Sequence, residues 1–533
     1  DLSLIAVTSG TLVIDTTSSS NATGGGVNNT TVSNAVTVSG GAVVTTGVVG
    51  TNPVNGGGTA LSPTALVAGQ VFNSTANVND NFTGLAATLV GTTVNGNAGD
   101  TDTITLTGAS GALAIGDGTN GGTITNIKTL NLANATNTIT FGATTTGITT
   151  VNGGTGDDSV NVTGAGATFA AGNVNLGLGN NQLTLGNFSY TGTFSAGAGT
   201  DTLVLGTASN IGGANVTGFE NLTIATGGSV TMSAAQFAAA TGTIVAAGTV
   251  AGTNGETVTL STAGTITGSA VIENFVLANG TNAVTLAATA ANQTFTGGTG
   301  NDTFTTTAAN LAWKTINAAG GTGDTLTVTD ALGAFNLGAA ATATTALVSG
   351  VEIVNFNVAT TGAVTLFNGA ATVNAAGGTF ILGSGGQTLV SSAAVTVTGG
   401  AGADAITLSS GNDTIVGSGS LFSSNIDTVT NFKVAGTDVF KTGTAATTLN
   451  SLNIATADIS TLAAAIASAA SAVGAAVALQ ATTQAYIVTV AAGTAAGTYA
   501  FQNIGGTVGA VDAGDFIVKL VGAGSIVAGD FIA

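Results

Sequence analysis

A turn in which an aspartate follows closely spaced glycines recurs along the chain, and it constrains the fold more than any other feature. Five instances are GGTGDDSVNV (153–162), GAGTDTLVLG (197–206), GGTGNDTFTT (297–306), GGTGDTLTV (320–328) and GGAGADAITL (399–408). Apolar residues alternating with Thr, Ser or Asn follow the acid in most of them. Such alternation predicts strands with one buried face, so we expect a succession of short strands separated by acidic turns.

The acids of these turns recur at a nearly constant interval. Asp80 and Asp102 are 22 residues apart, and so are Asp302 and Asp324. A period of about 20–23 residues, built from short strands and turns, is typical of one coil of a parallel β-helix, in which equivalent residues stack about 4.8 Å apart. The sequence therefore predicts an all-β fold, a right-handed parallel β-helix or β-roll.

The charged and reactive residue types exclude several classes of function. The chain has 5 basic residues, all Lys, against 24 acids, which gives a net charge of −19. Nucleic-acid backbones are bound by clusters of basic side chains, so we expect no nucleic-acid partner. The chain has no Cys and no His, which removes thiolate and imidazole metal sites and Ser-His-Asp catalysis. A cation is the natural partner of so acidic a chain, and no enzymatic activity is expected.

Two segments break the strand pattern. The Ala-rich segment 456–480 has Leu462, Ile466 and Val473 at roughly helical spacing, with Asp458 or Ser460 placed to cap a helix. A shorter segment, 232–241, is expected to form a turn or two of helix. Both are interpreted as packing elements. No apolar run is long enough to predict a membrane span.

A second phrase recurs between the acidic turns, as in TGFENLTIAT (217–226) and SGVEIVNFNV (349–358). Three of the four Glu of the chain, Glu220, Glu273 and Glu352, take the same place in it. Each Glu is expected to end a coil or to pair with a nearby amide or Lys. A role in calcium binding or in a subunit contact is the alternative.

The Gly-rich acidic turns fit the pattern GGxGxDxUx, in which U is a large apolar residue. The glycines allow backbone carbonyls to turn inward, the Asp supplies a carboxylate at the corner, and U enters the core. Calcium takes six to eight hard oxygen ligands, which an Asp and the turn carbonyls of two stacked coils can supply. Asp404 and Asp413, nine residues apart, are the sharpest instance, whereas Asn181 stands where the pattern has an acid. At isolated turns, a plain Asx turn without an ion is the alternative.

These nonapeptides, the run NIDTVTNFKVAGTDVF (425–440) and the acidic, aliphatic C-terminal segment resemble the end of RTX proteins. The Glu-containing phrases in a Thr-, Ala- and Gly-rich chain are similar to RTX-type bacterial surface-layer (S-layer) proteins. The resemblance implies type I secretion by an uncleaved C-terminal signal and a homo-oligomeric lattice on the bacterial cell surface. It also implies calcium in the β-helix turns, and cell-surface lipopolysaccharide as a further partner.

Carried over position by position, the resemblance assigns the calcium carboxylates and the organisation of the chain. The expected metal ligands are Asp80, Asp102, Asp158, Asp201, Asp302, Asp324, Asp404, Asp413 and Asp427. The expected parts are an unplaced N-terminal β segment (1–70), a β-helical repeat body (71–398), a nonapeptide β-roll (399–440) and a C-terminal α+β cap with the secretion signal (441–533).

Three classes of function are compatible with these features. The first is a structural protein that self-assembles, with calcium, into a two-dimensional extracellular surface layer or a related sheet or tube. The second is a monomeric RTX adhesin or matrix-binding protein. The third is a β-helical polysaccharide lyase or hydrolase, which the single Trp, the three Tyr and the lack of Arg disfavour because sugar and uronate sites use such residues.

Overall fold

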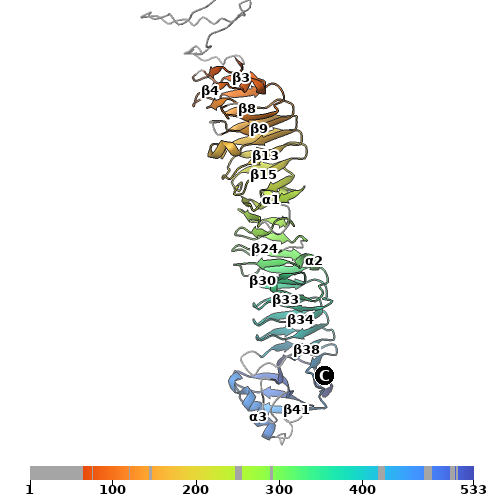
Figure 1. The fold of residues 1–533 in the computed structure, drawn as a ribbon. Helices are drawn as coiled ribbons and strands as arrows, with labels where there is room; N and C mark the ends of the chain where they lie inside the picture. The colour runs from red at the N-terminus through yellow and green to blue at the C-terminus, as the bar shows by residue number, and fades with distance from the viewer. Residues whose placement is uncertain are drawn as a thin grey trace, which may run out of the picture. The chain divides into compact units, whose positions relative to one another are not determined.

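The computed structural model describes residues 64–74, 76–118, 120–142, 147–246, 255–288, 292–417, 426–472, 483–504, 511 and 514–533 (Figure 1). Most of the segment 1–70 therefore lies outside the described residues. The chain divides into two compact units, of which the first comprises 1–205 and 213–221 and the second 206–212 and 222–533.

The first unit is a stack of parallel strands. Its 8-stranded sheet holds, in order, β1 (Thr64–Ala65), β3 (Asn81–Gly84), β5 (Thr103–Leu106), β8 (Thr129–Asn131), β10 (Thr150–Gly154), β12 (Asn173–Gly177), β14 (Thr193–Ser195) and β16 (Asn215–Thr217). A small sheet holds β2 (Val71–Asn73), β4 (Thr93–Asn95) and β7 (Thr123–Thr125). A third series pairs β6 (Ala112–Ile115), β9 (Asn137–Phe141), β11 (Asp158–Asn161), β13 (Gln182–Leu185) and β15 (Thr202–Leu205).

The second unit continues the same design with two long sheets. One runs β18 (Ser229–Met232), β20 (Thr257–Leu260), β22 (Asn274–Val276), β24 (Gln293–Thr296), β26 (Lys314–Asn317), β30 (Thr345–Ser349), β28 (Phe335–Asn336), β32 (Ala363–Thr365), β34 (Gly378–Ile381), β36 (Val395–Thr398), β38 (Thr414–Val416), β40 (Val439–Lys441) and β45 (Phe531–Ile532). The strand β29 (Gly338–Thr342) forms an antiparallel pair with β30.

The other long sheet takes the alternate strands. It runs β21 (Thr265–Thr267), β23 (Ala283–Thr285), β25 (Thr303–Thr306), β27 (Thr325–Val328), β31 (Ile353–Phe356), β33 (Thr372–Ala375), β35 (Thr388–Ser391), β37 (Ala405–Thr407), β39 (Thr428–Thr430), β44 (Phe516–Val521), β43 (Gly497–Gln502), β42 (Gln484–Val490) and β41 (Thr448–Ile454). In the same unit β17 (Asn221–Ile224) pairs with β19 (Ile244–Ala246). Successive strands of the body thus enter one sheet and then the other, and the predicted all-β parallel stack is confirmed.

The alternation seen in the sequence sets which side chains are buried. Val151 pairs in register with Val174, 23 residues later, and both are at most 1% exposed. On the opposite face Asn152 donates from Nδ2 to Oδ1 of Asn131, 2.9 Å away in the preceding coil. Apolar side chains therefore stack inside, and Asn and Thr form hydrogen-bonded ladders outside, because equivalent positions of each coil share a face.

Coil length varies more than the predicted period of 20–23 residues. Phe82 pairs with Ile104 at 22 residues, which confirms the period there. In the second unit the interval falls to 16 between Val373 and Leu389. It rises to 32 between Ile316 and Val348 and to 28 between Leu326 and Val354, where the chain forms the β29–β30 hairpin. Turns take up the difference while the strand register is kept.

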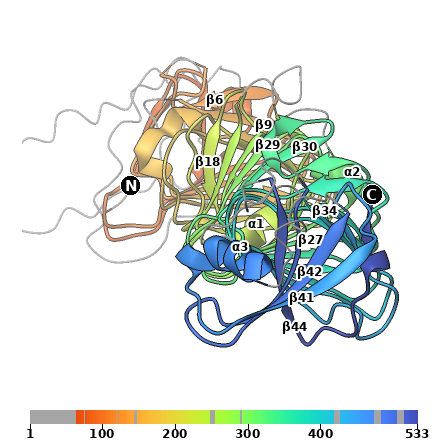
Figure 2. The same ribbon diagram turned by 90° about the horizontal axis from the view of Figure 1, so that it is seen from below.

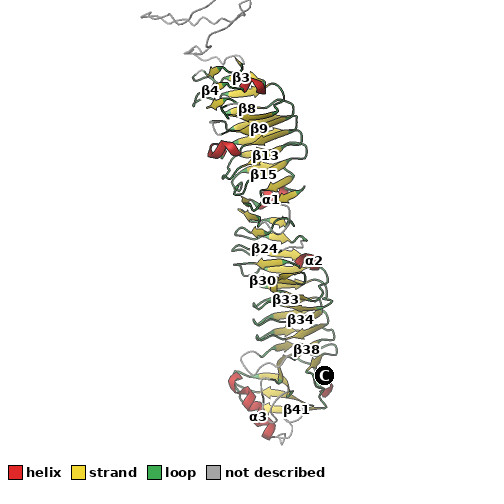
Figure 3. Cartoon of the chain, viewed as in Figure 1, coloured by secondary structure: helices red, strands yellow, loops and turns green. Residues whose placement is uncertain are grey.

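Helices are few and short, as Figure 3 shows in red. The segment predicted at 232–241 contains α1 (Ala234–Ala239), which Ser233 and Gln236 close with a capping box. The helix predicted at 456–480 contains α3 (Leu462–Ala472), and residues 473–482 lie outside the described part. Asp458 lies one short 3-10 turn, 459–461, before α3. The single-turn helix α2 (Ala308–Leu311) was not predicted.

The C-terminal part combines α3 with a mixed sheet. Strand β41 is parallel to β42, whereas β42, β43 and β44 are antiparallel, and β44 joins β39 of the solenoid in parallel. Figure 2 shows α3 beside β41, against which it packs through the buried side chains of Leu462 and Ile466. No helix among the described residues is long and apolar enough to cross a membrane.

Candidate functional site

The acids predicted from the turns form ladders in which each coil bonds to the next. In the first unit the main-chain N–H of Asp80 donates to Oδ1 of Asp102 at 2.8 Å. The N–H of Asp158 donates to Oδ1 of Asn181 at 2.9 Å, and that of Asn181 to Oδ1 of Asp201 at 2.7 Å. All five side chains are at most 2% exposed. The sequence interval thus places each side chain over the backbone amide of the same position in the preceding coil.

The second unit repeats this arrangement. The N–H of Asp302 donates to Oδ1 of Asp324 at 2.6 Å, and the N–H of Asp404 donates to Oδ1 of Asp427 at 3.0 Å. The next carboxylate, Asp413, instead receives the N–H of Val395 at 2.7 Å. The predicted acids are therefore all found in the turns of the stack, directly before strands or at their first residue.

The nonapeptide pair does not form one rung. Asp404 precedes β37 and Asp413 precedes β38, and these strands belong to the two different long sheets. Asp413 donates its N–H to Oδ1 of Asp438, 2.9 Å away. Nine residues thus carry the chain from one sheet to the other, and each acid continues the ladder on its own side.

Several ladder members were missed by the sequence analysis. Asn137 and Asn282 donate from Nδ2 to Oδ1 of Asp158 and Asp302, each at 2.7 Å. Both amides also close their own turns by bonding backbone carbonyls, as at Asn137 with Ala135. Asp438 was also missed, although it follows a glycine in AGTDVF and precedes a strand, which is the signal used elsewhere. Both Asn and Asp side chains therefore occupy the ladder positions of these turns.

The glycines before the acid have a steric role. At Gly297 an added Cβ would lie 2.7 Å from Oδ2 of Asp302 and would overlap the carbonyl oxygen of Ala318 in the next coil. At Gly153 it would lie 2.6 Å from Oδ2 of Asp158. A side chain at either glycine would occupy the space in which the carboxylate bends back over its own turn. This close approach explains why an acid follows glycines so regularly.

Burial makes these carboxyl groups weaker acids. It raises the pKa of Asp158, Asp404 and Asp413, although hydrogen bonds from amides partly oppose the effect. At Asp427, burial raises the pKa to about 7, with a smaller contribution from the charge of Asp404. At these four acids, hydrogen bonds do not fully compensate for the burial of the carboxyl group.

The Glu of the second recurring phrase continue the same ladders. Oε2 of Glu220 accepts the N–H of Asp201, and Oε2 of Glu352 accepts that of Asp324, each at 2.9 Å. Glu273 accepts the N–H of Glu256, also at 2.9 Å. The interpretation that each Glu pairs with a nearby amide is confirmed, and the Glu stacks on an acid in all three cases.

The acids differ in how well they could hold calcium. Asp102 and Asp158 accept amide hydrogen bonds on both oxygens, so a cation would have to compete with N–H donors there. Asp201 and Asp324 each keep a buried Oδ2 that accepts no hydrogen bond. No group of three or more acids in the described part of the chain is arranged to hold a metal. A calcium ion would therefore need backbone carbonyls and water beside one or two carboxylates, and Asp201 and Asp324 fit it best.

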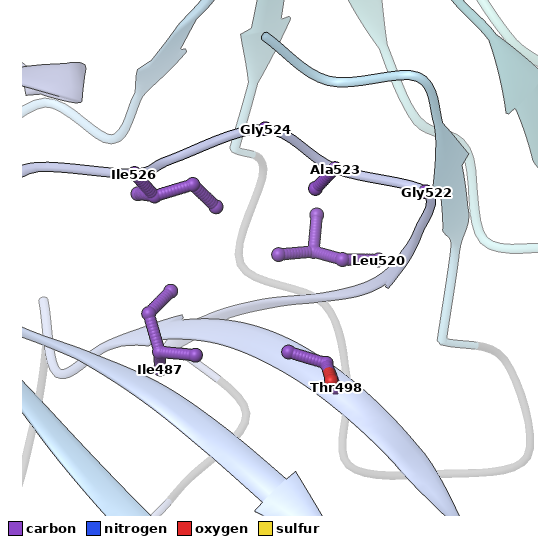
Figure 4. A pocket seen from close by; sticks show the side chains of 7 residues that line it. All are labelled: Ile487, Thr498, Leu520, Gly522, Ala523, Gly524 and Ile526. Atoms are coloured by element: carbon purple, nitrogen blue, oxygen red, sulfur yellow. The ribbon is translucent and has the colours of Figure 1, made fainter. Parts of the chain in front are cut away.

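A hollow in the C-terminal part is of a different kind. It has a volume of about 350 Å³ and lies between β42, β43 and β44 and the segment 522–526 (Figure 4). The side chains that line it are apolar apart from the hydroxyl of Thr498, as in Ile487, Leu520 and Ile526. No titratable side chain lines it, so it offers no acid, base or metal ligand.

Comparisons of the chain with protein-family models, with curated proteins and with solved structures found no match.

Proposed function

We propose that this chain is a structural protein that self-assembles, with calcium, into a two-dimensional extracellular surface layer on a bacterial cell. The observation that carries this proposal is the extent of the repetitive stack. In each unit, coils of short parallel strands make up most of the described residues between β1 at Thr64 and β40 at Lys441, interrupted by a hairpin and short helices. Each stack supplies extended surface, which suits a structural role.

The charge of the chain supports the calcium dependence. With a net charge of −19, copies of the chain repel one another at neutral pH. Neutralisation of acids by a divalent cation lowers that repulsion, and metal binding adds to the free energy of folding where calcium is abundant. Assembly would then be confined to the outside of the cell. Type I secretion and attachment to lipopolysaccharide complete the proposal and stem from the family resemblance.

The test is negative-stain electron microscopy of the purified chain, dialysed first against EGTA and then against millimolar calcium, with magnesium as the control. Ordered sheets or tubes in calcium alone are expected. Assembly in EGTA as well would refute the calcium dependence. A monomer in both buffers would refute the lattice and favour the adhesin alternative, which glycan binding would then examine.

A further inference from the structure

Two acids of the ladders, Asp201 and Asp324, differ at one oxygen from Asp158 and Asp302. Their Oδ1 atoms accept the N–H of the preceding coil, from Asn181 at 2.7 Å and from Asp302 at 2.6 Å. Their Oδ2 atoms are buried and accept no hydrogen bond, and both residues are 0% exposed. An uncompensated buried carboxylate oxygen is costly, so these two positions call for a positive partner.

The missing donor can be identified by comparing neighbouring coils of the second unit. In the turn of Asp302 the N–H of Gly298, four residues earlier, donates to Oδ2 at 3.2 Å. In the turn of Asp324 the N–H of Gly320, again four residues earlier, donates to the carbonyl oxygen of Gly298 at 3.1 Å. The backbone of the turn has therefore bonded to the coil below, and the carboxylate has lost its donor.

The first unit shows the same contrast. The N–H of Gly154 donates to Oδ2 of Asp158 at 3.3 Å. The equivalent amide before Asp201 belongs to Gly197, and it donates to the carbonyl oxygen of Gly177 at 2.7 Å. Two turns far apart in sequence thus lose the same hydrogen bond in the same way.

A second carboxylate lies at each of these two positions. Glu220 and Glu352 reach the N–H of Asp201 and Asp324 through Oε2, as described above, and their charges act on the buried acids. At Asp201 the charge of Asp157 adds to that of Glu220. Like charges held close together in a partly buried turn repel unless a proton or a cation lies between them.

The turn of Asp324 also brings three oxygens close together beside a glycine. A Cβ added to Gly321 would lie 2.9 Å from each of Oδ1 and Oδ2 of Asp324 and 2.9 Å from the carbonyl oxygen of Gly300. The space beside Gly321 is therefore bordered by three oxygens, two from a carboxylate and one from the preceding coil. An ion bound by these oxygens would lie farther from the backbone than this Cβ position, which is at bonding distance from the α-carbon of Gly321.

From these features we propose that Asp201 with Glu220, and Asp324 with Glu352, form two calcium sites in which the cation replaces the lost amide donor. Backbone carbonyls and water supply the remaining ligands of each ion. The inference rests on the calcium dependence proposed above, selects two of the nine predicted acids and adds two Glu ligands. It does not depend on the lattice.

The third stacked pair, Glu256 and Glu273, is a different case. Oε1 of Glu256 accepts the N–H of Gly227 at 2.9 Å, and Oε2 receives no amide donor. Burial raises the pKa of Asp201 and Asp324, whereas at Glu256 burial is outweighed by hydrogen bonds, so that its pKa is lowered. We therefore leave this pair out of the proposal.

The test is isothermal titration of the full chain, stripped with EGTA, with CaCl₂ at neutral pH. Glu220→Gln and Glu352→Gln keep an oxygen that can accept the ladder N–H but remove the charge. Each variant is expected to bind one calcium ion fewer than the unchanged chain, and the double variant two fewer. Asp324→Asn is a second probe of the same site, because Asn occupies equivalent ladder positions at Asn181 and Asn282. It too should lose one ion.

Asp158→Asn is the matched control, since both oxygens of Asp158 already accept amide hydrogen bonds. It is expected to bind as many ions as the unchanged chain, and circular dichroism checks that every variant is folded. Unaltered stoichiometry in the Gln variants, or no calcium binding by the unchanged chain, would overturn the assignment. If calcium still induced sheets while the Gln variants bound normally, the lattice proposal would stand without these sites. If the variants lost ions but no sheets formed, the sites would stand alone.

Discussion

Lys314 is a buried, poorly compensated charge in the body of the solenoid, and its replacement by Met should stabilise the protein. The side chain is 0% exposed and pairs in register with Gln293 of the preceding coil. The hydrogen bond that the described structure gives its Nζ is to the carbonyl oxygen of Ala312, at the long distance of 3.4 Å. Burial lowers the pKa of Lys314 from 10.5 to about 8.

The size of the effect follows from this pKa. One pKa unit corresponds to about 1.4 kcal/mol, so the lowering of Lys314 amounts to about 3 kcal/mol of unfavourable charge burial at pH 7. Lys314→Met removes the charge and keeps most of the volume, and we expect it to raise the free energy of unfolding by up to that amount. The gain should shrink as the pH rises from about 8 to 10.5, because the folded lysine becomes neutral while the unfolded one stays charged.

The assay is denaturant unfolding followed by the fluorescence of Trp313, the single tryptophan of the chain and the neighbour of Lys314. Measurements at pH 7, 9 and 10.5 give the difference between variant and unchanged chain. Lys441→Met, at an exposed position, is the control and should change stability by less than about 0.5 kcal/mol at each pH. A destabilised Lys314→Met variant, or a gain that does not depend on pH, would refute the reasoning.

Two further predictions concern the ladders. Gly297→Ala should cost about 1–3 kcal/mol of unfolding free energy in urea melts, because the added methyl group meets Oδ2 of Asp302 and the carbonyl of Ala318. Gly320→Ala is the control and should cost less than about 1 kcal/mol, because the nearest atom to its added methyl group is 3.9 Å away. Equal costs for the two variants would contradict the steric account. Asp158→Ala should cost about 1–3 kcal/mol in the same assay because the N–H of Asn137 loses its acceptor. Asp158→Asn should cost less than Asp158→Ala, because its one oxygen still accepts the N–H of Asn137 although its NH₂ group cannot accept that of Gly154; equal losses with Asn and Ala would show that the charge itself is needed.

The sequence allowed the strands, the stacking interval and the positions of the acids to be predicted, because each depends on a local pattern. Alternation of Thr with Val, Ile or Leu determines which face is buried, and a glycine-acid turn marks where a strand begins. The coil of 28 residues that contains β29 and β30 was not predicted, since turns of different length can hold the same register. Nor could the sequence reveal that Lys314 occupies a ladder position under Gln293, which depends on three-dimensional stacking.

The sequence also could not show which acids accept a hydrogen bond on both carboxylate oxygens. GGTGND at Asp302 and GGTGD at Asp324 look equivalent, yet their turns differ by one residue between the glycines and the acid. In GGTGND the amide four residues before the acid belongs to the second glycine, Gly298, which donates to the acid. In GGTGD it belongs to the first glycine, Gly320, which donates to the preceding coil instead. A single residue of turn length thus decides whether a buried carboxylate receives a backbone donor.

The occurrence of Glu in place of Asp at three ladder positions depends on the residue that precedes the acid. Phe219, Ile272 and Val351, the residues directly before the three Glu, are buried, whereas Thr200 and Asn301, before Asp201 and Asp302, are exposed. An inward apolar side chain next to the acid takes up space at the corner of the core. The longer arm of Glu still reaches the amide of the preceding coil across that corner. The recurring phrase therefore combines a core contact with a ladder contact, which accounts for an apolar residue and a Glu occurring together.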